Sequence, residues 1–100
     1  MTRQELQAAI SKARSAAGDE GPIIVVDFME AEPLGGWGVV AYVRDDDYEP
    51  FVVHRWATVA YNGEAIPFRL WSGGYYDHAQ HWMLDFVERS GRATQPVTAD

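Results

Sequence analysis

Two histidines and an aspartate in the last quarter of the sequence have the spacing of a metal-binding cluster. His78, His81 and Asp85 occupy positions i, i+3 and i+7 and fall on the polar face of a predicted helix. Imidazole and carboxylate groups arranged in this way can bind a divalent metal and activate water for hydrolysis. A structural site needs four ligands, however, and neither a cysteine nor a fourth ligand is evident. We therefore predict no metal site and no cofactor, and a small metal-dependent hydrolase stays an alternative.

His54 is the histidine outside that helix, and a histidine beside an aspartate can act as a general base. Asp27 and Asp77 are conceivable partners, but nothing in the sequence places either of them next to His54. Ser72 precedes a glycine pair without the G-x-S-x-G pattern of a nucleophile elbow. The sequence therefore predicts no catalytic residue and favours a protein that is not an enzyme.

Aromatic side chains follow a turn signal in the middle of the chain. Asn62-Gly63 separates two β-rich segments, 51–61 and 64–72, and such a pair is typical of a type I′ turn between hairpin strands. If the turn has two residues, Trp56 lies opposite Arg69 and His54 lies opposite Trp71 on one side of the hairpin. The aliphatic and small side chains fall on the other side, where they can form a core: Ala57, Val59, Ile66, Phe68 and Leu70.

This arrangement predicts a surface for binding another protein. Tryptophan, tyrosine and arginine are enriched at the energetic centres of interfaces, and Tyr75 and Tyr76 extend the aromatic side toward the second helix. The predicted partner-binding residues are His54, Trp56, Arg69, Trp71, Tyr75 and Tyr76. Two alternatives stay open: an aromatic ladder that only stabilises the hairpin, or a helix that covers this side.

A compact acidic turn is the other polar feature, formed by Asp45, Asp46, Asp47 and Glu49. Such a turn can mimic the phosphates of a nucleic acid, or it can simply be the solvated tip of a hairpin. The whole chain has 8 basic and 15 acidic residues and a net charge of -7. Nucleic-acid binders normally cluster basic residues, so this charge disfavours a nucleic-acid ligand and favours a basic protein partner, although solubility explains the charge equally well.

Several features favour the cytoplasm, or the host cytoplasm if a phage encodes the chain. There is no cysteine, which fits a reducing compartment. The longest apolar runs, such as 23–26, are too short to cross a membrane, and the polar segment 1–5 lacks the apolar region of a secretory signal.

The predicted elements are a helix over 2–17, strands over 23–30, 37–44, 51–61 and 64–72, and a helix over 77–90. Thr2 with Glu5 forms a capping box at the first helix, and Asp77 with Gln80 forms one at the second. The run 23–26 shows no alternation, which predicts a strand that is central or covered on both faces. Pro67 predicts an edge position for the fourth strand.

Short turns between consecutive strands predict an antiparallel meander. The expected fold is therefore α+β, with four antiparallel strands between an N-terminal and a C-terminal helix. We expect two layers, with both helices on one face of the sheet. Residues 1–91 form one domain in this prediction, and 92–100 form a disordered tail.

The second half of the chain resembles a group of small proteins. The matching segments are 51–56 (FVVHRW), 70–76 (LWSGGYY) and 85–89 (DFVER). They are similar to uncharacterised proteins of actinobacteria and their phages that carry a strand, a W-G-x-Y-like turn and a helix ending in D-F-x-x-R. The longer hairpin and the doubled glycine at 73–74 depart from that pattern. The resemblance implies a phage or mobile-element accessory protein and carries over no catalytic residue.

The predicted function is a non-enzymatic protein-binding module that modulates or inhibits a host protein. A homo-oligomeric structural protein is the first alternative, followed by the metal-dependent hydrolase and by an acidic mimic of a nucleic acid.

Overall fold

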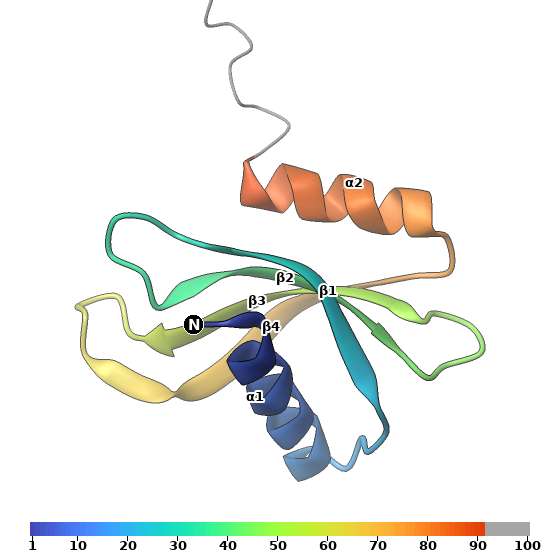
Figure 1. Ribbon diagram of the computed structural model, residues 1–100, viewed down its shortest axis with the longest axis horizontal. Coiled ribbons are helices and arrows are strands. Elements are labelled where there is room, and N and C mark those ends of the chain that lie inside the picture. Colours follow the sequence, from blue (N-terminus) through green and yellow to red (C-terminus); the bar gives the residue numbers. More distant parts are fainter. Residues whose placement is uncertain (92–100) are drawn as a thin grey trace, which may run out of the picture.

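The computed structural model describes residues 1–91 as a sheet of consecutive antiparallel strands with a helix before and after it (Figure 1). In chain order the elements are α1 (Arg3–Ala16), β1 (Ile23–Glu30), β2 (Trp37–Arg44), β3 (Phe51–Val59), β4 (Ala65–Tyr76) and α2 (Ala79–Ser90). The sheet order β1-β2-β3-β4 confirms the predicted α+β meander. The predicted tail lies outside the described residues. No helix within residues 1–91 has the length and apolar character needed to cross a membrane.

The ends of α1 follow from its sequence. The Thr2 hydroxyl accepts from the Glu5 N–H at 3.1 Å, and the Glu5 carboxylate accepts from the Thr2 N–H at 2.8 Å, which confirms the capping box. The helix stops where Gly18 takes a positive φ of 84° and the Asp19 N–H donates back to the Arg14 carbonyl. In α2, by contrast, the capping prediction was wrong: His78 is the N-cap residue, and it makes no side-chain capping hydrogen bond.

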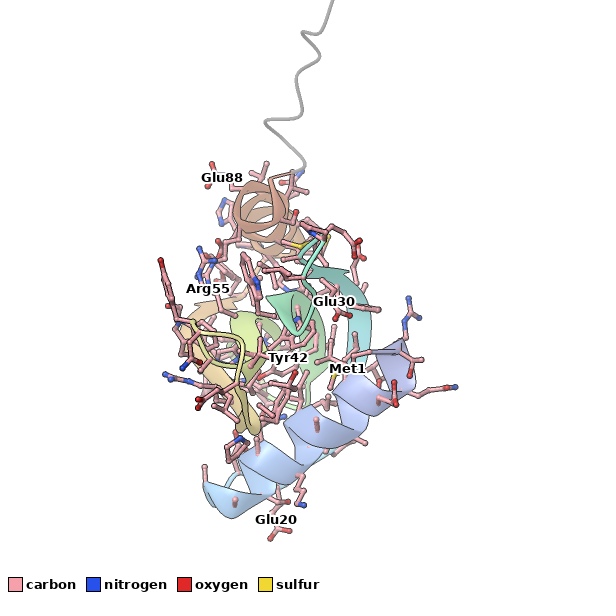
Figure 2. All side chains as sticks on the ribbon, turned by 90° about the vertical axis from the view of Figure 1, so that its left-hand side faces the viewer. Met1, Glu20, Glu30, Tyr42, Arg55 and Glu88 are labelled. Carbon is pink, nitrogen blue, oxygen red and sulfur yellow. The ribbon has the colours of Figure 1, made fainter. Side chains whose placement is uncertain are left out.

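The two helices lie on opposite faces of the sheet, so the molecule has three layers and not the predicted two (Figures 1 and 2). Leu6 and Ile10 of α1 pack on one face, and Trp82 and Phe86 of α2 pack on the other. The cause is β2, whose residues 38–42 are all buried. Because neighbouring side chains of a strand point to opposite faces, an unbroken apolar run makes both faces apolar, and each face then needs a cover.

The structure also corrects the position of β1. This strand is at an edge of the sheet, and its burial alternates: Ile23 and Val25 are buried, while Ile24 is 63% exposed. The apolar run predicted a central strand because isoleucine and valine favour strands wherever they point. The edge position predicted for the strand that contains Pro67 is confirmed, since β4 is the other edge.

The hairpin between β3 and β4 has a longer loop than predicted. The Ala60 N–H donates to the Glu64 carbonyl at 2.7 Å, which leaves Tyr61, Asn62 and Gly63 in the loop. Gly63 has a φ of 88°, but Asn62 does not have the positive φ that a type I′ turn requires. The three-residue loop pairs Val59 with Ala65, and an irregularity between Ala57 and Val59 then shifts the register, so Trp56 lies opposite Leu70 instead of Arg69.

β4 also continues beyond its predicted end. It passes through an irregularity opposite residues 53–55 and runs on to Tyr76. Tyr75 and Tyr76 are therefore strand residues that pair with Val52 and Phe51, and not residues at the entrance to α2.

Candidate functional site

The six predicted contact residues do not form one surface. Arg69 and Trp71 lie on the side of the sheet that α2 covers in part, where they belong to an open hollow. His54 and Tyr75 lie on the α1 side, in a separate pocket. Tyr76 is half-buried near α2, and Trp56 is in the core. The structure thus divides the predicted aromatic side of the hairpin between the two faces of the sheet.

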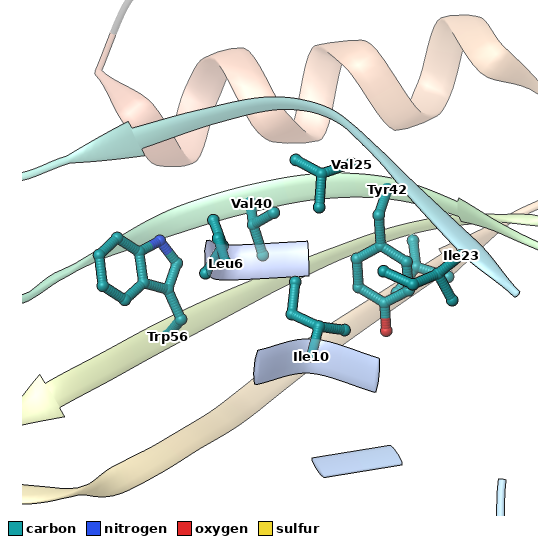
Figure 3. Close-up of a cluster of buried hydrophobic side chains, with 8 residues drawn as sticks. Leu6, Ile10, Ile23, Val25, Val40, Tyr42 and Trp56 are labelled. Carbon is teal, nitrogen blue, oxygen red and sulfur yellow. The ribbon is translucent and has the colours of Figure 1, made fainter. Parts of the chain in front are cut away.

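Trp56 is fully buried on the α1 side, so its prediction as a contact residue was wrong. Its indole lies in the cluster that contains Leu6 and Val40 (Figure 3) and stacks on Phe68 with ring centroids 6.5 Å apart. The physical cause is the position of α1, because Trp56 lies on the face of the sheet that Leu6 and Ile10 cover.

We call the open hollow the tryptophan hollow. It has a volume of about 900 Å³ and lies at the end of the sheet that carries the β1–β2 and β3–β4 turns, on the left in Figure 1. Its principal lining residues are Trp37, Val59, Tyr61, Ile66, Arg69 and Trp71. The α2 cluster covers the neighbouring part of this face around Val39, Ala41 and Val53 and leaves this end open.

Ala57 explains why the hollow exists. It is the Cα partner of Trp37 on β2 and of Arg69 on β4, so a methyl group separates larger side chains on both neighbouring strands. The Arg69 guanidinium lies over the Trp71 ring, 4.9 Å from its centroid, and Arg55 is the Cα partner of Trp71. Ala57 thus gives the hollow a small apolar floor. The indoles of Trp37 and Trp71 stand on either side of it, and the Arg69 guanidinium lies on the Trp71 ring.

Trp37 was missed as a contact residue in the sequence, although it is 44% exposed. The glycine-rich segment around it indicated only the start of a strand. The useful signal was its spacing from Val39, because residues i and i+2 of a strand share a face. The turn before it is fixed by the Glu30 carboxylate, which accepts from the Gly36 N–H at 2.8 Å.

The second site, which we call the histidine pocket, is lined by Arg14, Tyr42, Arg44, His54 and Tyr75 together with Ala13, Ala17, Asp19 and Leu70. Its volume is about 270 Å³. The Tyr42 hydroxyl is 3.1 Å from His54 Nδ1, and the Tyr75 hydroxyl is 3.3 Å from Nε2. Burial, with a smaller effect of nearby arginines, lowers the pKa of His54 to about 4, so the ring is neutral at pH 7.

The glycine pair at 73–74 makes this arrangement possible. A Cβ atom on Gly73 would lie 2.7 Å from His54 Nε2 and 2.7 Å from the Tyr75 hydroxyl. A Cβ atom on Gly74 would lie 2.7 Å from Asp85 Oδ2, on the other face of the sheet. Ser72 just before them has a positive φ of 54°, and its carbonyl accepts from Arg89. The doubled glycine is therefore a steric requirement on both sides of β4.

Asp85 has a structural role that differs from metal binding. Its Oδ1 accepts from Arg89 Nε at 2.8 Å and its Oδ2 accepts from the Tyr76 hydroxyl at 2.6 Å. His78 and His81 contact each other with ring centroids 5.8 Å apart. Within the described part of the chain, no group of three or more histidine, cysteine, aspartate or glutamate side chains is placed to hold a metal ion. The geometry does not assemble the site that the hydrolase alternative requires.

The acidic turn is ordered by one of its own carboxylates. Asp46 Oδ1 accepts from the N–H groups of Tyr48 and Glu49 at 2.9 and 2.8 Å, and these bonds lower the pKa of Asp46. Asp45, Asp47 and Glu49 are exposed. Since consecutive turns of a meander alternate between its ends, the acidic turn lies at the opposite end of the sheet from the tryptophan hollow (Figure 1).

Comparison of the chain with protein-family models, with curated proteins and with solved structures found no match. The function must therefore be inferred from the tryptophan hollow, from the histidine pocket and from the side chains that line them.

Proposed function

We propose that this chain is a non-enzymatic protein-binding module and that the tryptophan hollow is its contact surface. The observation that carries the proposal is an open apolar hollow of about 900 Å³ with Trp37 and Trp71 at its sides. The resemblance described above favours a phage or mobile-element protein that modulates or inhibits a host protein. Its place of action would then be the host cytoplasm.

The chemistry of the hollow suits a protein partner. A tryptophan side chain that becomes fully buried on binding contributes much more than an average contact, and such residues cluster with arginine at the centre of interfaces. Trp71 is already partly ordered by the Arg69 guanidinium stacked on it, so little rotamer freedom remains to be lost when a partner covers it.

The charge inside the hollow indicates what the partner presents. Arg69 is the charged residue among those that line it, and Arg55 projects on the same side of β3. The net charge of the whole chain is -7, but electrostatic attraction acts over a Debye length of about 8 Å in physiological salt. We therefore expect an apolar or aromatic side chain next to a carboxylate on the partner, even though the chain as a whole would attract a basic protein.

Selection from a random peptide display library tests this proposal with a defined probe. The immobilised protein should enrich peptides that combine aromatic or aliphatic residues with aspartate or glutamate. Trp71→Ala and Arg69→Glu should each weaken the binding of those peptides at least about tenfold, which corresponds to 1.4 kcal/mol.

The matched control is Leu84→Ala. Leu84 is an apolar residue of α2 that is 64% exposed, and its side chain is not part of the hollow. This variant should bind the selected peptides as the unchanged protein does. Peptides that bind all three variants equally, or a selection without an acidic-apolar consensus, would contradict the proposal.

Self-association is the second candidate function, because the chain itself contains a segment of the expected chemistry. The acidic turn carries Tyr48, which is 83% exposed, beside Asp47 and Glu49. Since this turn and the hollow lie at opposite ends, a second copy would bind head to tail. Light scattering across a concentration series distinguishes the candidates: growth of the particle mass that Tyr48→Ser abolishes supports self-association, and a constant monomer mass contradicts it.

The acidic turn also supports the third candidate, a mimic of nucleic acid. That activity requires Asp45, Asp47 and Glu49 to bind a basic groove, so capture of a basic partner should weaken steeply as salt is added. Capture that is insensitive to salt and to neutral substitutions of these residues would contradict it.

A further inference from the structure

Arg14, which lines the histidine pocket, has a buried donor without an acceptor. Arg14 Nη1 is inaccessible to solvent and has no hydrogen-bond partner, although Nε and Nη2 of the same side chain both donate to Asp19 Oδ2, at 3.2 and 2.7 Å. Leaving a buried charged donor unpaired costs the desolvation of that group without a compensating hydrogen bond. A buried polar group of this kind calls for a bound water, ion or ligand as its partner.

The histidine beside it fixes the direction of a hydrogen-bond chain. A neutral imidazole donates from one nitrogen and accepts at the other. Tyr42 is only 1% exposed, so its hydroxyl is satisfied when it donates to His54 Nδ1. His54 Nε2–H then donates to the Tyr75 hydroxyl, whose own proton is left for an acceptor elsewhere. Tyr75 is 43% exposed and lines the pocket, so this proton is available there.

Two cations complete the lining. Arg14 lies 5.8 Å from the centroid of the Tyr42 ring, and Arg44 lies 4.9 Å from the centroid of the Tyr75 ring. Arg44 Nε is held by the Glu49 carbonyl at 3.0 Å. Arg44 Nη2 also lies 3.7 Å from Asp46 Oδ2. Stacking on the rings and anchoring at some of their nitrogens reduce the freedom of both guanidinium groups, so both are pre-organised to donate to a shared acceptor.

We propose that the histidine pocket binds a small oxyanion, in which one carboxylate or phosphate group accepts hydrogen bonds from the Arg14 guanidinium, the Arg44 guanidinium and the Tyr75 hydroxyl. Arginine recognises carboxylate and phosphate by the same planar donors, so the chemistry of the bound group is common to both. The volume of about 270 Å³ is below the usual range for a drug-sized ligand, and it suits a small acid or inorganic phosphate.

Asp19 also lines the pocket and provides a second, opposite test of the proposal. Its carboxylate is 52% exposed and takes two of the Arg14 donors. A bound anion would be repelled by this negative charge and would share Arg14 with it. Removing the charge should therefore strengthen anion binding, whereas removing the guanidinium should weaken it.

Titration of the full chain with inorganic phosphate, and separately with acetate, tests the proposal by ¹H–¹⁵N NMR at constant ionic strength. We expect saturable shifts at millimolar concentration for at least one of the two anions, centred on residues around Arg14, Arg44 and Tyr75. Arg14→Gln and Tyr75→Phe should each raise the dissociation constant at least about tenfold, and Asp19→Asn should lower it.

Arg69→Gln is the matched control, because Arg69 lies on the other face of the sheet and should leave anion binding unchanged. Tyr75→Phe removes only a hydroxyl from a partly exposed ring, so the test survives if Arg14→Gln fails to fold. The proposal would be overturned if sodium chloride reproduced the shifts, if the shifts were centred elsewhere, or if neither anion gave saturation. It would also be overturned if the Tyr75 and Asp19 variants bound the anion with the affinity of the unchanged protein. The pocket does not depend on the tryptophan hollow, so failure of one proposal leaves the other standing.

Discussion

Trp56 lies opposite Leu70 in the β3–β4 ladder, and both side chains belong to the α1 side of the sheet. A two-residue turn at Asn62-Gly63 would have placed Arg69 opposite Trp56, with both side chains on one face. The register of β4, which the three-residue loop and the irregularity between Ala57 and Val59 set together, decides on which face Trp71 lies, whereas Trp56 is buried because α1 covers its face. This pairing separates Trp56 from Trp71, and the two tryptophans should respond differently to truncation.

Trp56→Ala should destabilise the protein strongly, and Trp71→Ala should not. Truncating a fully buried aromatic side chain typically costs about 3–5 kcal/mol, because it leaves a cavity. Trp71 lies in an open hollow, so its truncation should cost less than about 1.5 kcal/mol. Urea unfolding followed by far-UV circular dichroism measures both values, and equal losses for the two variants would contradict the assignment of faces.

Gly63→Ala should destabilise the hairpin by about 1 kcal/mol, through the backbone alone. Gly63 has a φ of 88°, but a Cβ atom there would meet nothing within 4 Å. Gly63→Asn is the matched comparison, because asparagine tolerates the left-handed region better than alanine. Thermal unfolding should rank the unchanged protein above the asparagine variant and the asparagine variant above the alanine variant. An alanine variant as stable as the unchanged protein would mean that the loop does not need this conformation.

The sequence was sufficient to predict the helices and strands, but it was not sufficient to predict the register between β3 and β4. Helical spacing, the capping box at Thr2 and Glu5, and the glycines at positions 18 and 91 mark helix ends that the structure confirms. The segment Asn62-Gly63 marks a turn correctly, but the same two residues fit a two-residue loop and the second half of a three-residue loop. Local residue preferences do not separate these loops, because the choice is made by packing of the whole hairpin.

The number of layers could have been predicted from the sequence. The unbroken run of buried residues in β2 requires a cover on each face, whereas the two-layer prediction rested only on the simplest way to pack two helices on one sheet. The histidine pocket could not be predicted from the sequence, because it joins the end of α1 to three strands and depends on the irregularity at Ser72. That irregularity is a positive φ at a serine, which no local pattern in the sequence predicts.

Gly73→Ala should destabilise the protein by about 1–3 kcal/mol by overpacking, and the loss should depend on His54. The new methyl group would lie 2.7 Å from both His54 Nε2 and the Tyr75 hydroxyl, so His54→Ala removes one of the two clashes. In the double variant the cost of Gly73→Ala should therefore be smaller than in the unchanged background. Gly74→Ala is the control, since its methyl group would meet Asp85 on the other face, and His54→Ala should not relieve it. Additive losses at Gly73 and His54 would contradict their contact.

Stability should fall as the pH is lowered from about 6.5 toward 4, because of His54. Burial lowers the pKa of His54 to about 4 in the folded chain, against an ordinary value of 6.5. Above pH 6.5 the ring is neutral in both states. Below it, the unfolded chain binds a proton that the folded chain does not bind, so protons favour unfolding. The full effect is at most about 3 kcal/mol and is reached near pH 4.

The comparison with His54→Gln isolates this contribution. Tyr42, with its pKa raised to about 12 by burial, stays protonated in this range. Carboxylates titrate in both proteins, so their effect largely cancels in the difference. The free energy of unfolding, measured with urea at a series of pH values, should therefore fall less steeply for His54→Gln between pH 6.5 and 4. Parallel curves for the two proteins would show that His54 takes up its proton as readily in the folded chain as in the unfolded one.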